Sequence, residues 1–322
     1  MAIRKFGQYV LLTIQNEKGE VIFETDNLKV DFDIRHVRGY SRAKVTITNL
    51  NPSTIKKLSN AKGGNYVTIK TSLHDGPLEL LADRLYISNA LEEIKVPIST
   101  LNLYCYSSLL NKVLEKQIDL LLTDTKIEGI INSVTTAAGF TGKVEYKHFP
   151  DEVLNYKPPR SYTKQQGSAI NIIEALGEEH RFNLYTEGPK LVVMYKPDIK
   201  NVASTDFFLT KEVIKLSTTN MRATPKIGPA TLSVTTNLDS RIKPAVVLDI
   251  TELLTVGTNV DEENLQLLNK YLREKIAGFS KYQTLSVQHK GSNWADLWMT
   301  QATATSPTPG TTASSSETRW WI

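Results

Sequence analysis

Cysteine is almost absent from this 322-residue chain, which contains only Cys105. A single cysteine excludes an internal disulfide and any zinc site built from several thiolates. Long apolar runs are missing too, because no stretch approaches the roughly 18 continuous apolar residues of a membrane helix. The apolar run that follows Arg4 and Lys5 covers only 9–12, which is shorter than the ~7–15 residues of a signal peptide. These absences predict a soluble, intracellular protein with reduced thiols and no membrane insertion.

The chain also lacks a large excess of charge of one sign. It has 38 Lys and Arg residues and 34 Asp and Glu residues, which gives a formal net charge of +4. No segment forms a polybasic arm, and no stretch interleaves basic and aromatic residues, so bulk electrostatics gives no indication of nucleic-acid binding. The apolar content of 40% and charged content of 22% are those of a folded globular protein. The length predicts about two domains.

Motifs for catalysis and metal binding are missing as well. The five histidines include no pair at the i, i+4 spacing of metal ligands, and the sequence has no nucleophile elbow or phosphate-binding loop. Asp31 and Asp33 share the solvent face of an alternating strand, and His180, His289 and Cys105 fit structural positions. The sequence therefore predicts no enzyme, no metal site and no cofactor.

Alternation of apolar and polar side chains dominates the first hundred residues. It runs through 28–35, breaks at Gly39 and resumes through 43–48, which predicts an antiparallel hairpin. Asn51 and Pro52 are typical of a helix start, and the helix should bury its apolar side chains. Further strands are expected at 10–14, 66–70, 84–91 and 96–104. Residues 1–110 are therefore expected to form a small antiparallel β-barrel or β-sandwich.

The character of the sequence changes in residues 111–200, which predict a small α/β segment. The run from Thr125 to Glu128 has the pattern of a capping box before a helix that Gly139 ends. A second helix is expected at 168–179, followed by strands at 182–185 and 190–195. The intervening 149–164, which contains two consecutive prolines, has the composition of a linker.

Residues 201–305 return to strand patterns and predict a second barrel. Strands are expected at 231–235, 245–250, 282–289 and 294–303, with the last two joined by a turn at 290–292. A helix at about 261–277, capped by Asp261, is inserted between them. A weak internal repeat aligns 43–51 with 230–239, which favours two related barrels on either side of the α/β segment.

The last residues, 306–322, form a tail rich in Ser, Thr and Pro. This composition predicts a flexible segment. The tail nevertheless ends in Trp320, Trp321 and Ile322. Because tryptophan is enriched among the residues that dominate binding energy at interfaces, these three residues are the candidate partner-binding site.

Three short motifs carry a resemblance to a known family. They are the strand and helix start at 44–52, the helix opening at Gly167-Ser168-Ala169, and the passage 285–300, in which a His-Lys-Gly triplet precedes Trp-containing sequence. In this order they resemble the tail hub, or baseplate hub, proteins of tailed bacteriophages and of related contractile injection machines. The resemblance covers roughly 20–305. Residues 238–245 match the corresponding family turn poorly, which leaves the boundaries of the second barrel open.

The resemblance implies a structural virion protein with a mainly β fold, in which two tube-like antiparallel barrels flank the α/β segment. It implies a homotrimer that adapts the six-fold tail tube to the three-fold central spike and encloses the genome-ejection channel. The implied partners are other copies of the chain, the tail tube protein, the central spike protein and the tape-measure protein, with DNA only in transit. The implied location is the tail or baseplate of the virion, assembled in the host cytoplasm.

Two other functions stay open on the sequence. One is a hexameric tube, distal-tail or other baseplate protein, which would need one barrel per chain. The other is a glycan-binding or cell-wall-binding module in which Tyr and Trp side chains stack on sugars. A hydrolase is disfavoured, because 111–200 lacks a constellation of Glu and Asp in a helical context.

Overall fold

The computed structural model describes residues 7–37, 40–59, 64–73, 76–95, 98–107, 116–122, 125–147, 149, 151–158, 165–187, 190–195, 212–227, 231–255 and 280–305. The chain divides into two compact units. The first unit contains 1–196, 237–244 and 286–300, and the second contains 197–236, 245–285 and 301–322. Two segments from the C-terminal third of the sequence therefore complete the first unit.

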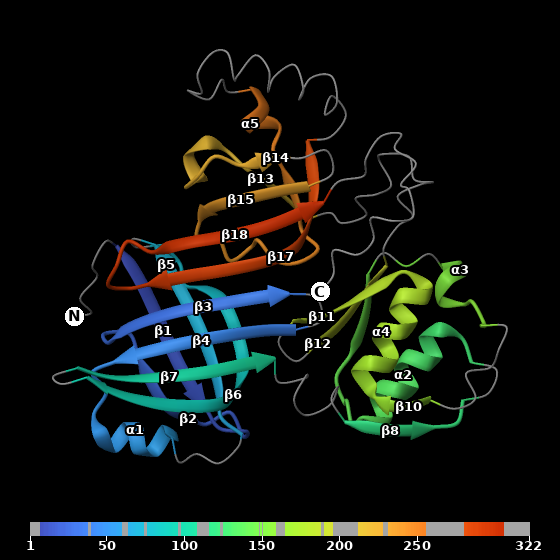
Figure 1. The fold of residues 1–322 in the computed structure, drawn as a ribbon, viewed down its shortest axis with the longest axis horizontal. Coiled ribbons are helices and arrows are strands. Elements are labelled where there is room, and N and C mark those ends of the chain that lie inside the picture. Colours follow the sequence, from blue (N-terminus) through green and yellow to red (C-terminus); the bar gives the residue numbers. More distant parts are fainter. Residues whose placement is uncertain are drawn as a thin grey trace. The chain divides into compact units, whose positions relative to one another are not determined.

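One antiparallel sheet dominates the first unit (Figure 1). Its neighbouring strands follow the order β18-β17-β3-β4-β7-β6-β5-β1-β2. The strands are β1 (Gln8–Gln15), β2 (Val21–Thr25), β3 (Lys29–Val37), β4 (Tyr40–Thr48), β5 (Tyr66–Leu73), β6 (Glu79–Lys95), β7 (Ile98–Ser107), β17 (Lys281–Ser292) and β18 (Trp298–Thr305). The expected mainly antiparallel β fold with an α/β insertion is confirmed. Among the described residues β2 is a free end of the sheet, so the strand pairing does not close a barrel.

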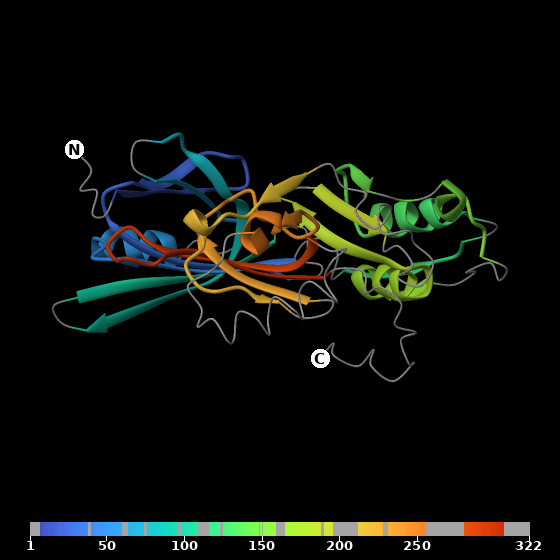
Figure 2. The ribbon, with the colours of Figure 1, turned by 90° about the horizontal axis from the view of Figure 1, so that it is seen from above.

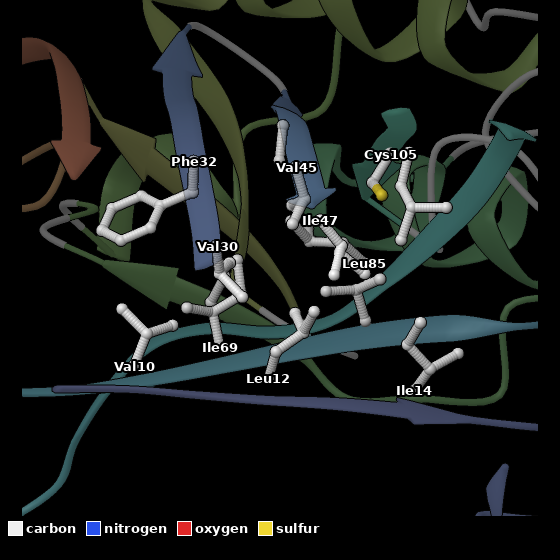
Figure 3. Close-up of a cluster of buried hydrophobic side chains, with 14 of the residues drawn as sticks. Val10, Leu12, Ile14, Val30, Phe32, Val45, Ile47, Ile69, Leu85 and Cys105 are labelled. Carbon is white, nitrogen blue, oxygen red and sulfur yellow. The ribbon is translucent and has the colours of Figure 1, made fainter. Parts of the chain in front are cut away.

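Side-chain alternation explains why this sheet encloses a core. In β1 the side chains of Val10, Leu12 and Ile14 are buried, and those between them are half-buried. Figure 3 shows these three side chains pointing toward side chains of β3 and β4, among them Phe32 and Ile47. The sheet therefore folds over, so that β1 and β5 face β3 and β4 across one apolar core. Each fully buried Leu or Ile side chain contributes about 1.5–3 kcal/mol to folding.

Helix α1 (Pro52–Ser59) follows β4 as the sequence predicted. The Asn51 side chain accepts a hydrogen bond from the Ser53 backbone N–H at 2.9 Å, which satisfies one donor of the first turn. Ile55 and Leu58 are both buried in the core of the first unit. The predicted cap and the predicted inward-facing residues of this helix are therefore confirmed.

The late hairpin turns at a different place from the one predicted. Strand β17 continues through 290–292, and the Ser292 N–H donates to the Leu297 carbonyl at 2.9 Å across the turn. Gly291 is paired with Phe32, and a Cβ on Gly291 would overlap the Phe32 ring and lie 2.9 Å from Trp298. The two rings meet edge to face with their centroids 5.8 Å apart. The expected turn at 290–292 was wrong because this glycine serves close packing of two aromatic rings.

Residues 116–195 form the α/β segment of the first unit. Its elements are β8 (Gln117–Leu120), α2 (Ile127–Ala137), β9 (Val144–Lys147), α3 (Asp151–Leu154), β10 (Gln165–Ser168), α4 (Ala169–His180), β11 (Phe182–Glu187) and β12 (Lys190–Tyr195). Strand β12 pairs antiparallel with β11 and parallel with β9, and β8 pairs with β10. Apolar side chains of α2 and α4 share one core with this sheet. Ser168 caps α4 by accepting a hydrogen bond from the Asn171 N–H at 3.4 Å, and the helix lies close to the expected 168–179.

The predicted capping box of α2 is not formed. The helix begins after Lys126, which makes no side-chain cap. The backbone N–H of Ile127 instead donates to the Tyr156 carbonyl at 3.2 Å. The Thr125 side chain lies against Gly129, where an added Cβ would come within 2.6 Å of it. A carbonyl from the predicted linker therefore replaces the expected side-chain cap, and that linker contains the short helix α3.

The second unit has its own strands and shares β17 and β18 with the first. Its other elements are β13 (Val213–Lys215), the 3-10 helix η2 (Thr218–Asn220), β14 (Lys226–Ile227), β15 (Thr231–Asn237), β16 (Val247–Asp249) and α5 (Thr251–Thr255). The neighbour order is β14-β15-β18-β17, and β16 pairs antiparallel with β17 and parallel with β13. Strands were predicted close to β15, β16, β17 and β18. The predicted helix at 261–277 and the tail at 306–322 lie outside the described residues.

Candidate functional site

The strongest candidate surface is the solvent side of strands β17, β3, β4, β7 and β6 in the first unit, which we name the outer face. The registers of the paired strands align its side chains in four rows. The rows are Gln288, Arg35, Arg42, Tyr106 and Tyr86; Lys290, Asp33, Lys44, Tyr104 and Asn89; Ser292, Asp31, Thr46, Asn102 and Leu91; and Lys29, Thr48, Thr100 and Glu93. Alternation places these side chains opposite those of the apolar core, as predicted for Asp31 and Asp33. Ser292 and Asn102 are nevertheless buried, whereas Arg35, Arg42 and Lys44 are exposed.

Both aspartates of the outer face are held by neighbouring bases. Asp33 is 3.2 Å from the Arg35 guanidinium and accepts a hydrogen bond from Gln288 Nε2 at 2.6 Å. Partial burial raises the pKa of Asp33, but hydrogen bonds from Arg35 and Gln288 outweigh it and hold this pKa below its ordinary value. Asp31 forms an ion pair with Lys29 at 3.4 Å. These contacts give the carboxylates a structural role, so they do not resemble a catalytic pair.

Strand pairing brings basic and aromatic side chains together, which no linear stretch of the sequence does. Arg42 is paired with Tyr106, and Lys44 lies over the Tyr104 ring, 5.7 Å from its centroid. The Tyr106 ring also meets Tyr86, with centroids 5.7 Å apart. This arrangement was not predicted from the sequence, although the i, i+2 spacing of the two bases and of the two tyrosines is a signal for it. The outer face is therefore polar, aromatic and mixed in charge.

Strands β6 and β7 extend as a two-stranded arm, visible in teal in Figure 2. We define the arm tip by Leu91, Ile94 and Ile98, whose exposed fractions are 49%, 66% and 47%. Strand β5 pairs with β6 only as far as Tyr86, so from Ser88 to Glu92 one edge of β6 faces no strand among the described residues. An exposed, apolar edge strand is a ready template for pairing with another chain.

The other residues that the sequence singled out fall into three groups. Trp320, Trp321 and Ile322 lie outside the described residues. Cys105 lies on β7 and is buried in the apolar core, where desolvation raises the pKa of its thiol. His180 ends α4, with its ring centroid 5.8 Å from that of Tyr156, and His289 is buried in β17. In the described part of the chain, no cluster of His, Cys, Asp and Glu side chains has the arrangement of a metal site.

None of the helices among the described residues combines the length and the apolar composition needed to cross a membrane.

Comparison with known proteins finds its matches among solved structures. No family model matches this sequence, and a search of curated proteins finds no significant match. The tail protein from Neisseria meningitidis MC58 matches with a TM-score of 0.55 and 10% identity, over 92% of this chain and 96% of that one. The 43 kDa tail protein of prophage MuSo2 from Shewanella oneidensis matches with a TM-score of 0.52 and 10% identity, over 93% of this chain and 98% of that one.

A third match extends the likeness to a secretion machine. An Escherichia coli component of the type VI secretion system, described as structurally similar to the bacteriophage T4 tail proteins gp27 and gp5, matches with a TM-score of 0.52 and 9% identity. The match covers 86% of this chain and 73% of that one. The likeness at this identity is one of fold, and it spans most of each chain. The resemblance to tail and baseplate hub proteins is therefore confirmed at the level of fold.

Proposed function

We propose that this chain is a structural hub of a phage-type tail or baseplate, and that three copies form a ring. The observation that carries the proposal is the fold, which two tail proteins share over more than nine-tenths of both chains. In this proposal residues 1–110 and 201–305 supply the two tube-like parts of each chain, and 111–200 decorates the ring. A trimer built in this way has six similar positions for a six-fold tube and a true three-fold axis for a spike.

The arm supports a contact between copies. Its tip exposes three large apolar side chains, and an exposed edge strand readily pairs with another chain. A contact between this arm and a different surface of the next copy is heterologous, and a heterologous contact closes into a ring when its rotation divides a full turn. In this proposal the arm of one copy binds a different surface of the next copy, so the contact repeats around a ring of three copies.

The outer face supports the role of a channel wall. Its four rows contain five basic residues (Lys29, Arg35, Arg42, Lys44 and Lys290) and three acidic ones (Asp31, Asp33 and Glu93), so its formal charge is 5 − 3 = +2. Two of the three acidic residues are paired with bases of the same face. A wall of this kind attracts the phosphates of passing DNA weakly, so DNA in transit is neither held nor repelled.

The partners follow from the position of a hub in a tail. They are the tail tube protein on the six-fold side, the central spike protein on the three-fold side, and the tape-measure protein in the channel. The chain would act in the tail or baseplate of a virion assembled in the host cytoplasm, without catalysis. The tail at 306–322 would bind a neighbouring protein through Trp320, Trp321 and Ile322.

Light scattering of the purified full-length chain tests the proposal. Three chains of 36.1 kDa give about 3 × 36.1 = 108 kDa, and six give about 217 kDa. A trimer that appears as a ring in electron micrographs supports the hub. A hexamer overturns the trimer in favour of a tube or distal-tail protein. A monomer that stays monomeric with the spike protein present and binds glycans overturns the hub in favour of a glycan-binding module.

A further inference from the structure

Two histidines that are far apart in the sequence meet on the core side of β17 and β3. The rings of His36 and His289 lie edge to face, with centroids 5.4 Å apart. The register pairs His289 with Ile34 and Val287 with His36, so the two imidazoles are diagonal neighbours across the sheet. His289 is 1% exposed. Buried imidazole rings in this position must either be neutral or have hydrogen-bond or ion-pair partners that compensate for their charge.

A chain of hydrogen bonds runs through the His289 ring. The Asp239 backbone N–H donates to Thr300 Oγ1 at 3.0 Å, and Thr300 Oγ1 is 2.9 Å from His289 Nδ1. The ring also bonds with the backbone of Ile242. A neutral ring with its proton on Nε2 satisfies both sides, because it accepts from the Thr300 hydroxyl and donates to the Ile242 carbonyl. The ring thus ties the segment 239–242 to strands β17 and β18.

The charged groups that face this pair are all cations. Desolvation lowers the pKa of both rings, to about 4 for His36, and Lys243 lowers both further. The neighbouring ring, His36, also lowers the pKa of His289. The other charged groups of the segment are Asp239 and Arg241, which pair with each other at 2.7 Å. The His36 Nδ1 lies 2.7 Å from Ser41 Oγ, an uncharged partner.

We propose that His36 and His289 form an acid-sensitive pin, which holds residues 238–244 on strands β17 and β18 at neutral pH and releases them when the rings are protonated. A proton on His289 Nδ1 turns this nitrogen from an acceptor into a donor, so the Thr300 hydroxyl keeps only its longer contact to the Asp239 carbonyl, at 3.4 Å. A second charge on His36 repels the first one. The pin lies within a single chain, so it acts in the monomer and in any assembly. Acid would thereby loosen the connection between β15 and β16 while the apolar core stays intact.

Hydrogen exchange of the full chain, followed by mass spectrometry, tests the pin. The measurement is made at about pH 7.5 and about pH 5, on either side of the ordinary histidine pKa, and corrected for the intrinsic pH dependence of amide exchange. We expect exchange in 238–244 to rise by about tenfold or more at the lower pH. Peptides from β1 and β5 serve as the internal reference and should not change. Equal protection of 238–244 at both pH values overturns the proposal.

Variants separate the pin from general acid effects. The double variant His36→Gln/His289→Gln should lose the difference between the two pH values, because glutamine does not titrate. His180→Gln, which changes a histidine at the end of α4, is the matched control and should keep the difference. Persistence of the acid response in the double variant overturns the pin. Hydrogen–deuterium exchange at the Cε1 position of each imidazole, measured in the unaltered chain over a range of pH, reports the pKa of each histidine. If both His36 and His289 titrate near about pH 6.5, the proposal is also overturned.

Discussion

The arm tip offers the most direct test of assembly, through replacement of its apolar residues by threonine. Leu91→Thr/Ile94→Thr/Ile98→Thr keeps residues that suit a strand and removes most of the apolar surface. Complete burial of such a side chain contributes about 2 kcal/mol, and about half to two-thirds of each side chain is still exposed in the isolated chain, at 49%, 66% and 47%. If a second copy covers all three, the triple variant loses up to about 3 kcal/mol per contact. This loss corresponds to about 100-fold weaker association.

Sedimentation velocity over a range of concentrations measures this effect. The triple variant should shift the midpoint between monomer and oligomer to at least about 100-fold higher concentration, because a closed ring of three copies contains three such contacts. Val21→Thr is the matched control, because Val21 lies on the other edge strand, β2, and is 56% exposed. Thermal unfolding should change by less than about 0.5 kcal/mol in either variant, because the altered side chains are exposed.

Two results would refute the reasoning. The first is an unchanged association midpoint in the triple variant, which would mean that the arm tip stays in water in the assembled protein. The second is an equal shift for Val21→Thr, which would mean that general surface polarity controls association. A triple variant that is no longer folded is recognised by its circular dichroism and is replaced by the single variant Ile94→Thr, for which the expected shift is about tenfold.

Four further predictions rest on other parts of the chain. Gly291→Ala should destabilise the first unit by about 1–3 kcal/mol in urea unfolding, because the new methyl group overlaps the Phe32 ring, and a neutral effect would contradict the packing argument. The pKa of His36 is lowered from 6.5 to about 4 in the folded chain, so the unfolded chain binds this proton at a higher pH than the folded chain does. About 3 kcal/mol of the free energy of unfolding present above pH 6.5 should therefore be lost as the pH falls to 4. A free energy of unfolding that stays constant in this window would contradict the lowered pKa. Asp31→Asn/Asp33→Asn should steepen the salt dependence of duplex DNA binding by up to about two phosphate contacts in fluorescence anisotropy, and an unchanged slope would argue against the outer face as the wall. Removal of 318–322 should leave the unfolding temperature unchanged and reduce incorporation into assembled particles, so equal incorporation would rule out the terminal anchor.

The sequence was a good guide wherever the structure repeats a local pattern. The alternation at 28–35 and 43–48 corresponds to β3 and β4, because one face of each strand lies in the core and the other faces water. Helix α1 was also recognisable, since its cap and its two buried side chains lie within one short segment. Local patterns predict these elements correctly because burial of a single face produces a regular alternation of apolar and polar residues along the sequence.

The features that matter most for function depend on pairing between distant strands. Strands expected at 84–91 and 96–104 are in fact the long β6 and β7, and the arm was missed because Glu92 and Glu93 interrupt the alternation. The pairing of Arg42 with Tyr106 needs the register of β4 with β7. The contact of His36 with His289 needs β3 beside β17. A single sequence does not fix such registers, because many shifts of two residues keep the same face buried.

In the proposed hub a single sheet would supply both a channel wall and an interface between copies, and these two roles need different surfaces. A wall for moving DNA needs polar side chains without strong binding, and the outer face meets this need because Arg35 and Lys29 pair with Asp33 and Asp31. An interface needs exposed apolar surface, and the arm tip, beyond the end of β5, exposes three large apolar side chains. Both demands are met because the arm extends β6 and β7 past the core. A shortened arm that keeps the five basic residues of the outer face, which lie on β3, β4 and β17, should therefore retain weak DNA binding and lose self-association. Simultaneous loss of both would mean that the two functions share one surface.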